Sequence, residues 1–153
     1  MSAENEIKLQ LAALCNKYVD EKISTAEEAI NSAQESANEE TKSSSGDKYE
    51  TGRSMMQLEI EKYSTQLTEG LKLKKALAQI DFNKTYQAVQ PGALVLTNNG
   101  NFFISVSAGK LSLDDIDYMA ISFSSPIGQA LANKVEKDII EFREKKYKIL
   151  TIT

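Results

Sequence analysis

The chain has 153 residues, of which 41% are hydrophobic and 26% charged, enough apolar material for one ordinary domain or a small domain with an extension. It contains no His and only one Cys, which excludes His-dependent catalytic triads, Cys/His zinc sites and an internal disulfide. The net charge of −4 makes free nucleic acid an unfavourable partner. No apolar run has the length of a membrane span and the first residues are acidic, so we expect a cytoplasmic protein.

Residues 1–83 predict an antiparallel hairpin of two long helices. The small polar run 41–47 ends in Gly-Asp and predicts a turn between helices over about residues 3–41 and 47–82. Residues 1–41 carry nine acids against three bases, which predicts a solvated acidic helix face. Apolar residues recur three or four positions apart in the first helix, with one phase shift after Tyr18: Ile7, Leu11, Leu14, Tyr18, Val19, Ile23, Ala26, Ile30, Ala33 and Ala37. The second helix repeats every seven residues at Tyr49, Met56, Tyr63 and Leu77.

Asp47 and Glu50 are the sharpest functional candidates, at the tip of this hairpin near residues 46–50. Residues three apart on a helix are neighbours, so the two carboxylates can converge, help to hold Mg²⁺ and orient an attacking water. Asp-x-x-Glu is also a capping box, with Asp47 as the N-cap and Glu50 reaching back. Both interpretations stay open, and a cap is compatible with a later metal role. Glu39 and Glu40 are expected to be solvated helix-end acids.

Residues 88–153 predict a small α+β domain. Asn98-Asn99-Gly100 separates two β-rich runs, 92–97 and 101–107, and predicts a hairpin. A third strand is expected over 118–123, and two closing antiparallel strands over 138–143 and 146–152 with a turn at Glu144-Lys145. Ser125-Pro126 predicts a capped short helix that continues to about residue 133. The overall prediction is therefore α+β: an N-terminal antiparallel coiled-coil hairpin, then a small antiparallel sheet with one short helix.

The second segment resembles the C-terminal domain of the bacterial Gre transcript-cleavage factors. The resemblance rests on Ile121-Ser-Phe-Ser-Ser-Pro-Ile-Gly-Gln-Ala-Leu-Ala-Asn-Lys134 followed by Asp138-Ile-Ile-Glu-Phe142, with Ser125 to Leu131 as its clearest part. The turn Gly46-Asp47-Lys48-Tyr49-Glu50 is similar to the acidic tip of the family's hairpin. The family joins an N-terminal coiled-coil hairpin to an FKBP-like domain, the same order as the two predicted segments. The family's tip typically continues with Asn where residue 51 is Thr, and a basic patch on the coiled coil has no strong equivalent here.

The resemblance implies a transcription elongation factor that inserts its hairpin tip into the secondary channel of RNA polymerase. It implies that Asp47 and Glu50 assist the polymerase's own active site to retain Mg²⁺ and cleave backtracked RNA, so the protein is not an enzyme and has no cofactor of its own. RNA polymerase and its backtracked RNA would be the partners, with no membrane and no sequence-specific DNA binding. The alternative is a secondary-channel regulator without cleavage stimulation. A prolyl isomerase and a plain coiled-coil scaffold rank below both.

Other residues carry weaker signals. Lys72, Lys74 and Lys75 form a basic cluster that favours a solvated face over an RNA contact. Cys15 is expected to be a small core residue. Asp114, Asp115 and Asp117 lack the Gly and terminal Glu of an EF-hand, so we expect a loop of acids there. The aromatic residues of the second segment are expected in its core: Phe102, Phe103, Tyr118, Phe123 and Phe142.

Overall fold

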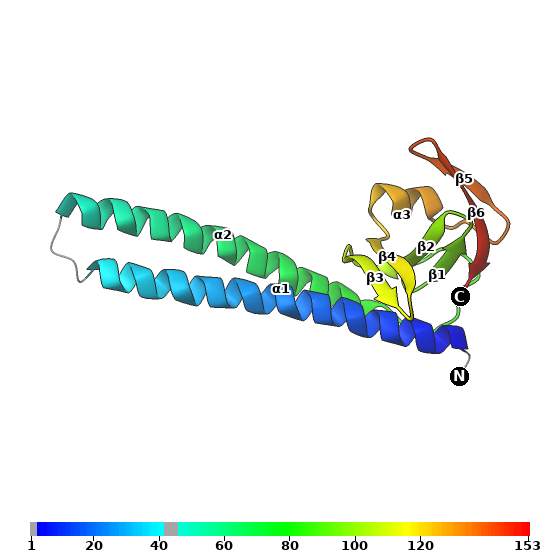
Figure 1. The fold of residues 1–153 in the computed structure, drawn as a ribbon, viewed down its shortest axis with the longest axis horizontal. Helices are drawn as coiled ribbons and strands as arrows, with labels where there is room; N and C mark the ends of the chain where they lie inside the picture. The colour runs from blue at the N-terminus through cyan, green and yellow to red at the C-terminus, as the bar shows by residue number, and fades with distance from the viewer. Residues whose placement is uncertain (1–2, 42–45) are drawn as a thin grey trace. The chain divides into compact units, whose positions relative to one another are not determined.

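A computed structural model describes residues 3–41 and 46–153, and for residues 40–51 it describes no side chains. Packing divides the chain into two compact units, one formed by Met1–Tyr18 with Lys75–Thr153 and the other by Val19–Lys74. Two long helices precede a six-stranded sheet and a short helix (Figure 1), which confirms the predicted α+β class. The elements are α1 (Ala3–Thr41), α2 (Gly46–Gln79), β1 (Leu94–Thr97), β2 (Gly100–Ser105), β3 (Gly109–Leu113), β4 (Ile116–Ser122), α3 (Pro126–Leu131), β5 (Ile139–Phe142) and β6 (Lys145–Ile152).

Helices α1 and α2 form the predicted hairpin, and their boundaries agree closely with the expected ones. Within the unit Val19–Lys74, α1 buries Val19, Ile23, Ala26 and Ala33. Gly70 of α2 allows a close approach here, because a Cβ atom at this position would lie 2.9 Å from Cγ1 of Ile23. The absence of a side chain at Gly70 therefore lets α2 approach α1 closely at Ile23.

The buried stripe of α1 differs from the predicted one at Tyr18. Tyr18 is 36% exposed, whereas Cys15 is fully buried and continues the stripe to Val19 and Ile23 at steps of four residues. Cys15 rather than Tyr18 therefore occupies the inward position, and the two consecutive steps of four residues from Cys15 to Ile23 place the phase shift of the stripe here. Helix α2 ends at Gln79, before the predicted end near residue 82. The Oδ1 atom of Asp81 accepts hydrogen bonds from the main-chain N–H groups of Asn83 and Lys84, and this turn follows a helix that ends at Gln79.

The sheet has the strand order β3-β4-β2-β1-β6-β5, and every neighbouring pair is antiparallel except β2 with β4. The predicted hairpin turn at Asn98-Asn99 is confirmed, since Thr97 pairs with Gly100. The last turn lies one residue earlier than predicted. Phe142 pairs with Lys145, so Arg143 and Glu144 form the turn, with φ values of 51° and 67°.

Strand β3 was not predicted, and it leads into the turn that contains Asp114 and Asp115. It pairs with β4 from Gly109↔Ala120 to Leu113↔Ile116, which leaves Asp114 and Asp115 as a two-residue turn with φ values of 52° and 65°. Such turns usually carry Gly or Asn because both central residues need positive φ. Asp and Asn tolerate this conformation better than most residues, so an Asp-Asp pair is permitted there.

Helix α3 and the segment before β1 cover one face of the sheet. The core on this side includes Val95, Phe102, Ile104, Leu131 and Ile149. The Oγ atom of Ser125 accepts a hydrogen bond from the N–H group of Gly128, and Pro126 is the first helical residue, so the predicted cap is confirmed. Phe123 and Phe142 pack partly buried against the core, as Ile127 does.

The opposite face of the sheet packs against the start of α1 and against Phe82, which follows α2. The rings of Phe82 and Phe103 stack with their centroids 5.1 Å apart, and the Sγ atom of Cys15 lies 3.5 Å from the Oγ atom of Ser105. Burial raises the pKa of the Cys15 thiol, and the hydrogen bond to Ser105 partly opposes this effect. The expectation that Cys15 is a small core residue is confirmed.

Candidate functional site

Asp47 and Glu50 are the second and fifth residues of α2, which begins at Gly46. Their side chains lie outside the described residues, as does the side chain of Glu40, so their geometry stays a prediction. The helical main chain alone places residues 47 and 50 on the same side of the helix, with Cβ atoms about 5–6 Å apart. The capping-box interpretation placed Asp47 immediately before the helix, whereas α2 includes it as the second residue.

Outside the tip, the described residues contain no group of three or more His, Cys, Asp or Glu side chains that could hold a metal ion. Asp114 and Asp115 belong to the turn between β3 and β4, and Asp117 accepts a hydrogen bond from the hydroxyl of Ser112 at 2.7 Å. Asp117 also lies 3.9 Å from Nζ of Lys110. The expected loop of acids is therefore confirmed for Asp114 and Asp115, whereas Asp117 lies in β4 opposite Ser112.

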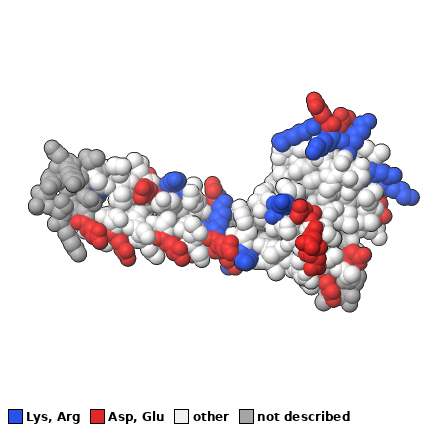
Figure 2. All heavy atoms as spheres, viewed as in Figure 1, with Lys and Arg blue, Asp and Glu red and all other residues white. Residues whose placement is uncertain are grey.

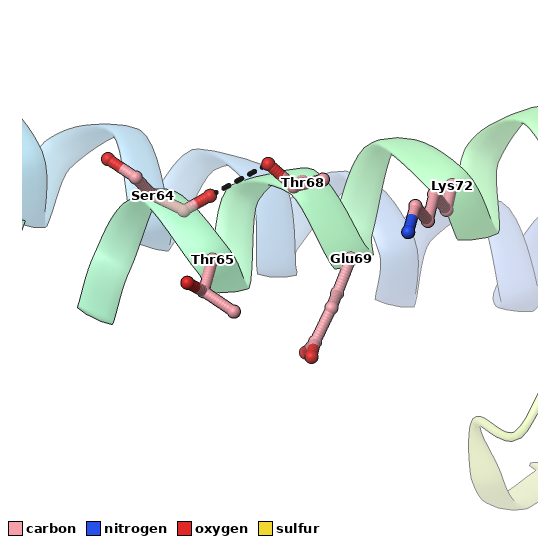
Figure 3. A pocket seen from close by; sticks show the side chains of 5 residues that line it. All are labelled: Ser64, Thr65, Thr68, Glu69 and Lys72. Carbon is pink, nitrogen blue, oxygen red and sulfur yellow. Dashed lines mark hydrogen bonds between the residues drawn. The ribbon is translucent and has the colours of Figure 1, made fainter. Parts of the chain in front are cut away.

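The basic cluster on α2 does not form one surface patch. Lys74 donates a 2.8 Å hydrogen bond to Asp20, with both side chains about half exposed. Lys72 lies on a shallow polar surface with Ser64, Thr65, Thr68 and Glu69 (Figure 3). The hydroxyls of Thr65 and Thr68 donate to the main-chain oxygens of Glu61 and Ser64, so they are engaged within the helix. A solvated helix face explains these residues.

Charge is distributed unevenly over the two units. Figure 2 shows acidic side chains along the hairpin unit, and Lys and Arg side chains together with some acidic ones at the end of the sheet domain where Figure 1 places β5 and β6. Glu21, Glu28 and Glu35 are exposed on α1 and follow each other at intervals of seven residues, so they lie along one side of the helix. The predicted solvated acidic face of the first helix is therefore present over this stretch.

Lys8 was not predicted to be buried, although it lies on the buried side of α1. Its side chain is fully buried, and its Nζ atom donates hydrogen bonds to the main-chain oxygens of Lys84 at 2.7 Å and Thr153 at 3.2 Å. Nζ also lies 4.8 Å from the centroid of the Tyr86 ring, a favourable cation–π distance. Burial lowers the pKa of Lys8 to about 8, and the nearby negative charge of Asp81 opposes this shift.

The burial of Lys8 could have been predicted from its spacing along α1. It precedes Leu11 by three residues and Cys15 by seven, so it lies on the buried stripe of α1. Tyr86 completes the environment, because its hydroxyl donates a 2.8 Å hydrogen bond to the main-chain oxygen of Asp81. Burial, and then the charge of Asp81, raises the pKa of Tyr86. These contacts hold the first turns of α1 against the sheet domain, and the amine of Lys8 is not exposed.

Among the described residues, neither long helix has a stretch apolar enough to cross a membrane. A comparison with models of known protein families finds no match, and a comparison with curated proteins finds none either. The resemblance to Gre factors therefore rests on the residues quoted above, together with a helical hairpin that precedes a mixed sheet domain.

Proposed function

We propose that the protein is a Gre-like accessory factor of RNA polymerase that stimulates cleavage of backtracked RNA. The observation that carries the proposal is the place of Asp47 and Glu50, three residues apart at the start of α2 and shortly after its connection to α1. A carboxylate pair at the end of a helical hairpin suits delivery into a narrow site on a larger assembly. The protein itself is not a nuclease under this proposal.

The sheet domain supports the proposal through its local architecture. In the motif from Ser125 to Leu131, Ser125 caps α3, Pro126 begins it and Leu131 is fully buried in the core. We propose that this domain is FKBP-like in fold but not a prolyl isomerase. Phe102 and Tyr147 pack into its core with an edge-to-face contact at 5.7 Å between ring centroids, so these two rings are engaged in packing.

The chemistry requires a shared metal site. Two carboxylates are too few to hold Mg²⁺ tightly, because this ion keeps several waters and takes further anionic ligands. Asp47 and Glu50 would hold the ion jointly with the acids and RNA of the polymerase, and the chemistry that the ion would supply there is the activation of a water for attack on the phosphodiester. The contribution of this chain is negative charge at a fixed position, and the attacking water and the metal belong to the polymerase complex.

A secondary-channel regulator without cleavage activity is the second candidate. It is favoured by the acidic face of α1, since Glu21, Glu28 and Glu35 would repel an RNA backbone. Cleavage of RNA in a stalled polymerase complex distinguishes the two functions. We expect wild-type protein to accelerate cleavage and Asp47→Asn to lose most of this effect at equal occupancy of the polymerase. Binding of the wild type without accelerated cleavage would favour the regulator.

A further inference from the structure

The turn between β1 and β2 contains the one Asn-Gly pair of the sequence. Asn99 precedes Gly100, whereas every other asparagine precedes a residue that has a side chain. Asn98, Asn99 and Gly100 are all exposed. In an Asn-Gly pair the asparagine side chain reacts most readily with the following main-chain nitrogen, because glycine has no Cβ atom to hinder the approach. This turn is therefore open to a covalent change that needs only water.

The main-chain conformation explains why position 100 is glycine. Gly100 has a φ value of 130°, in a region that residues with a Cβ atom rarely adopt. A Cβ atom built on Gly100 would have no heavy atom within 4 Å apart from those of its chain neighbours, so the torsion angle rather than lack of space selects glycine. The same open space allows the side chain of Asn99 to close a ring with the nitrogen of Gly100. The turn thus requires the very residue that makes Asn99 reactive.

The two asparagines of this turn hold it against β6. Nδ2 of Asn99 donates a 2.6 Å hydrogen bond to the main-chain oxygen of Lys146. Oδ1 of Asn98 accepts a 2.8 Å hydrogen bond from the N–H group of Lys148, and the N–H group of Asn98 donates to the main-chain oxygen of Lys148 at 3.2 Å. The connection to Lys146 depends on the side-chain amide of Asn99, because a main-chain oxygen can only accept a hydrogen bond.

We propose that Asn99 is a site of deamidation through Gly100, and that this modification releases the turn from β6. The main-chain nitrogen of Gly100 loses its proton and forms a bond to Cγ of Asn99, while Nδ2 takes up a proton and leaves as ammonia. Water then opens the resulting five-membered ring at one of its two carbonyl carbons, so position 99 becomes aspartate or isoaspartate. Solvent water is the only co-reactant, and the inference does not depend on the proposed function.

Both products remove the donor that binds Lys146. A carboxylate at position 99 can only accept, so it would face the main-chain oxygen of Lys146 as a second acceptor in place of the 2.6 Å hydrogen bond. Isoaspartate also adds one methylene group to the main chain between Thr97 and Gly100, which pair across the turn. Because the length of a turn fixes the register of the strands that it joins, isoaspartate disturbs the pairing of β1 with β2 as well.

Isotope labelling tests the reaction. Full-length protein is incubated in water enriched in heavy oxygen, at neutral and at mildly alkaline pH, and mass spectrometry of its peptides locates the label. We expect Asn99 to gain label about tenfold faster than Asn83, which is also exposed but precedes Lys84. Alkaline pH should accelerate labelling, because the nitrogen of Gly100 must lose its proton. Asn99→Gln should abolish the label, since a longer side chain closes a less favourable ring. Labelling of Asn99 no faster than of Asn83 would overturn the proposal.

Hydrogen exchange tests the release of the turn. Asn99→Asp reproduces the added charge and the lost donor, while Asn83→Asp adds the same charge at an exposed position outside this turn. We expect the amides of Asn98 and Lys148 to exchange about tenfold faster in Asn99→Asp and at the wild-type rate in Asn83→Asp. Deamidated wild-type protein, separated by its added charge, should exchange as fast as Asn99→Asp. Wild-type exchange rates in both Asn99→Asp and the deamidated protein would overturn the release of the turn.

Discussion

Replacing Lys8 by Met should change how stability depends on pH more than it changes stability at neutral pH. In the folded state Lys8 has a pKa of about 8, against an ordinary value of 10.5. This difference corresponds to about 3 kcal/mol, the cost of keeping the buried amine charged. Methionine has a similar length and removes that cost. It also leaves the main-chain oxygen of Lys84 without this donor, at about 1–3 kcal/mol, while the main-chain oxygen of Thr153 keeps the N–H group of Leu94 as a donor. The opposing contributions should leave Lys8→Met near the wild type at neutral pH.

The pH dependence has a definite sign. Between the two pKa values the unfolded chain still binds the Lys8 proton while the folded chain has released it, so stability rises with pH in this window. Integration from about pH 7 to about pH 9.5 gives a gain of about 2 kcal/mol for the wild type. Lys8→Met cannot show this gain. The raised pKa values of Cys15, Tyr86 and Tyr118 act in the opposite direction at high pH, and they are common to both proteins.

Urea unfolding of wild type and Lys8→Met across this pH range measures the difference directly. Subtracting the two free energies of unfolding at each pH cancels the contributions of Cys15 and Tyr118. Tyr86 contacts Lys8, but its pKa is raised above the ordinary value of 10.0, so it contributes little below about pH 9.5. We expect the wild type to gain on the variant by about 2 kcal/mol as pH rises. Parallel curves would show that Lys8 is not charged and buried in the folded state, and would refute the reasoning.

Three further substitutions test the packing. Ser125→Ala should cost about 1 kcal/mol in urea unfolding, because Gly128 N–H loses its acceptor, and an unchanged midpoint would show the cap to be unimportant. Ile127→Asp should cost a few kcal/mol by bringing an unpaired charge against the core, and an unchanged melting temperature would contradict its partial burial. Gly70→Ala should destabilise the hairpin, because the added Cβ atom would contact the side chain of Ile23. In a double-mutant cycle, the loss of unfolding free energy caused by Gly70→Ala should be smaller in the Ile23→Ala background. Additive unfolding free energies would exclude this contact.

Much of the fold was predictable because the decisive signals are local. The helices follow from apolar spacing, the β1–β2 turn from Asn98-Asn99-Gly100, and α3 from Ser125-Pro126. These features depend on a few neighbouring residues and on the torsion angles that each residue type favours. The predictions therefore agree with the structure at the level of element type and nearly at the level of boundaries.

The errors arose where tertiary contacts decide. Strand β3 buries only Leu111 among its five residues, so it lacks a strong apolar pattern and is held by pairing with β4. The parallel pairing of β2 with β4 depends on residues far apart in the chain. Lys8 was not predicted to be buried, because its acceptors come from Lys84 and Thr153. No local pattern shows these partners.

The candidate site was predictable only in part. Sequence identified Asp47 and Glu50, and the structure places them within the first five residues of α2, while their side-chain geometry stays a prediction. The register of β5 and β6 could not be predicted either, because the turn that sets Ile139 opposite Lys148 lies one residue earlier than expected. Register decides which side of a strand is exposed.

The Mg²⁺ dependence of RNA cleavage tests the central claim most directly. Cleavage in a stalled polymerase complex is measured over a Mg²⁺ titration with saturating wild type, Asp47→Asn or Glu50→Gln. If the tip carboxylates help to hold the ion, each variant should need more Mg²⁺ for half-maximal cleavage, because the amide keeps the size but loses the negative charge. An identical Mg²⁺ dependence for wild type and both variants, at equal polymerase occupancy, would contradict the metal-holding role of Asp47 and Glu50.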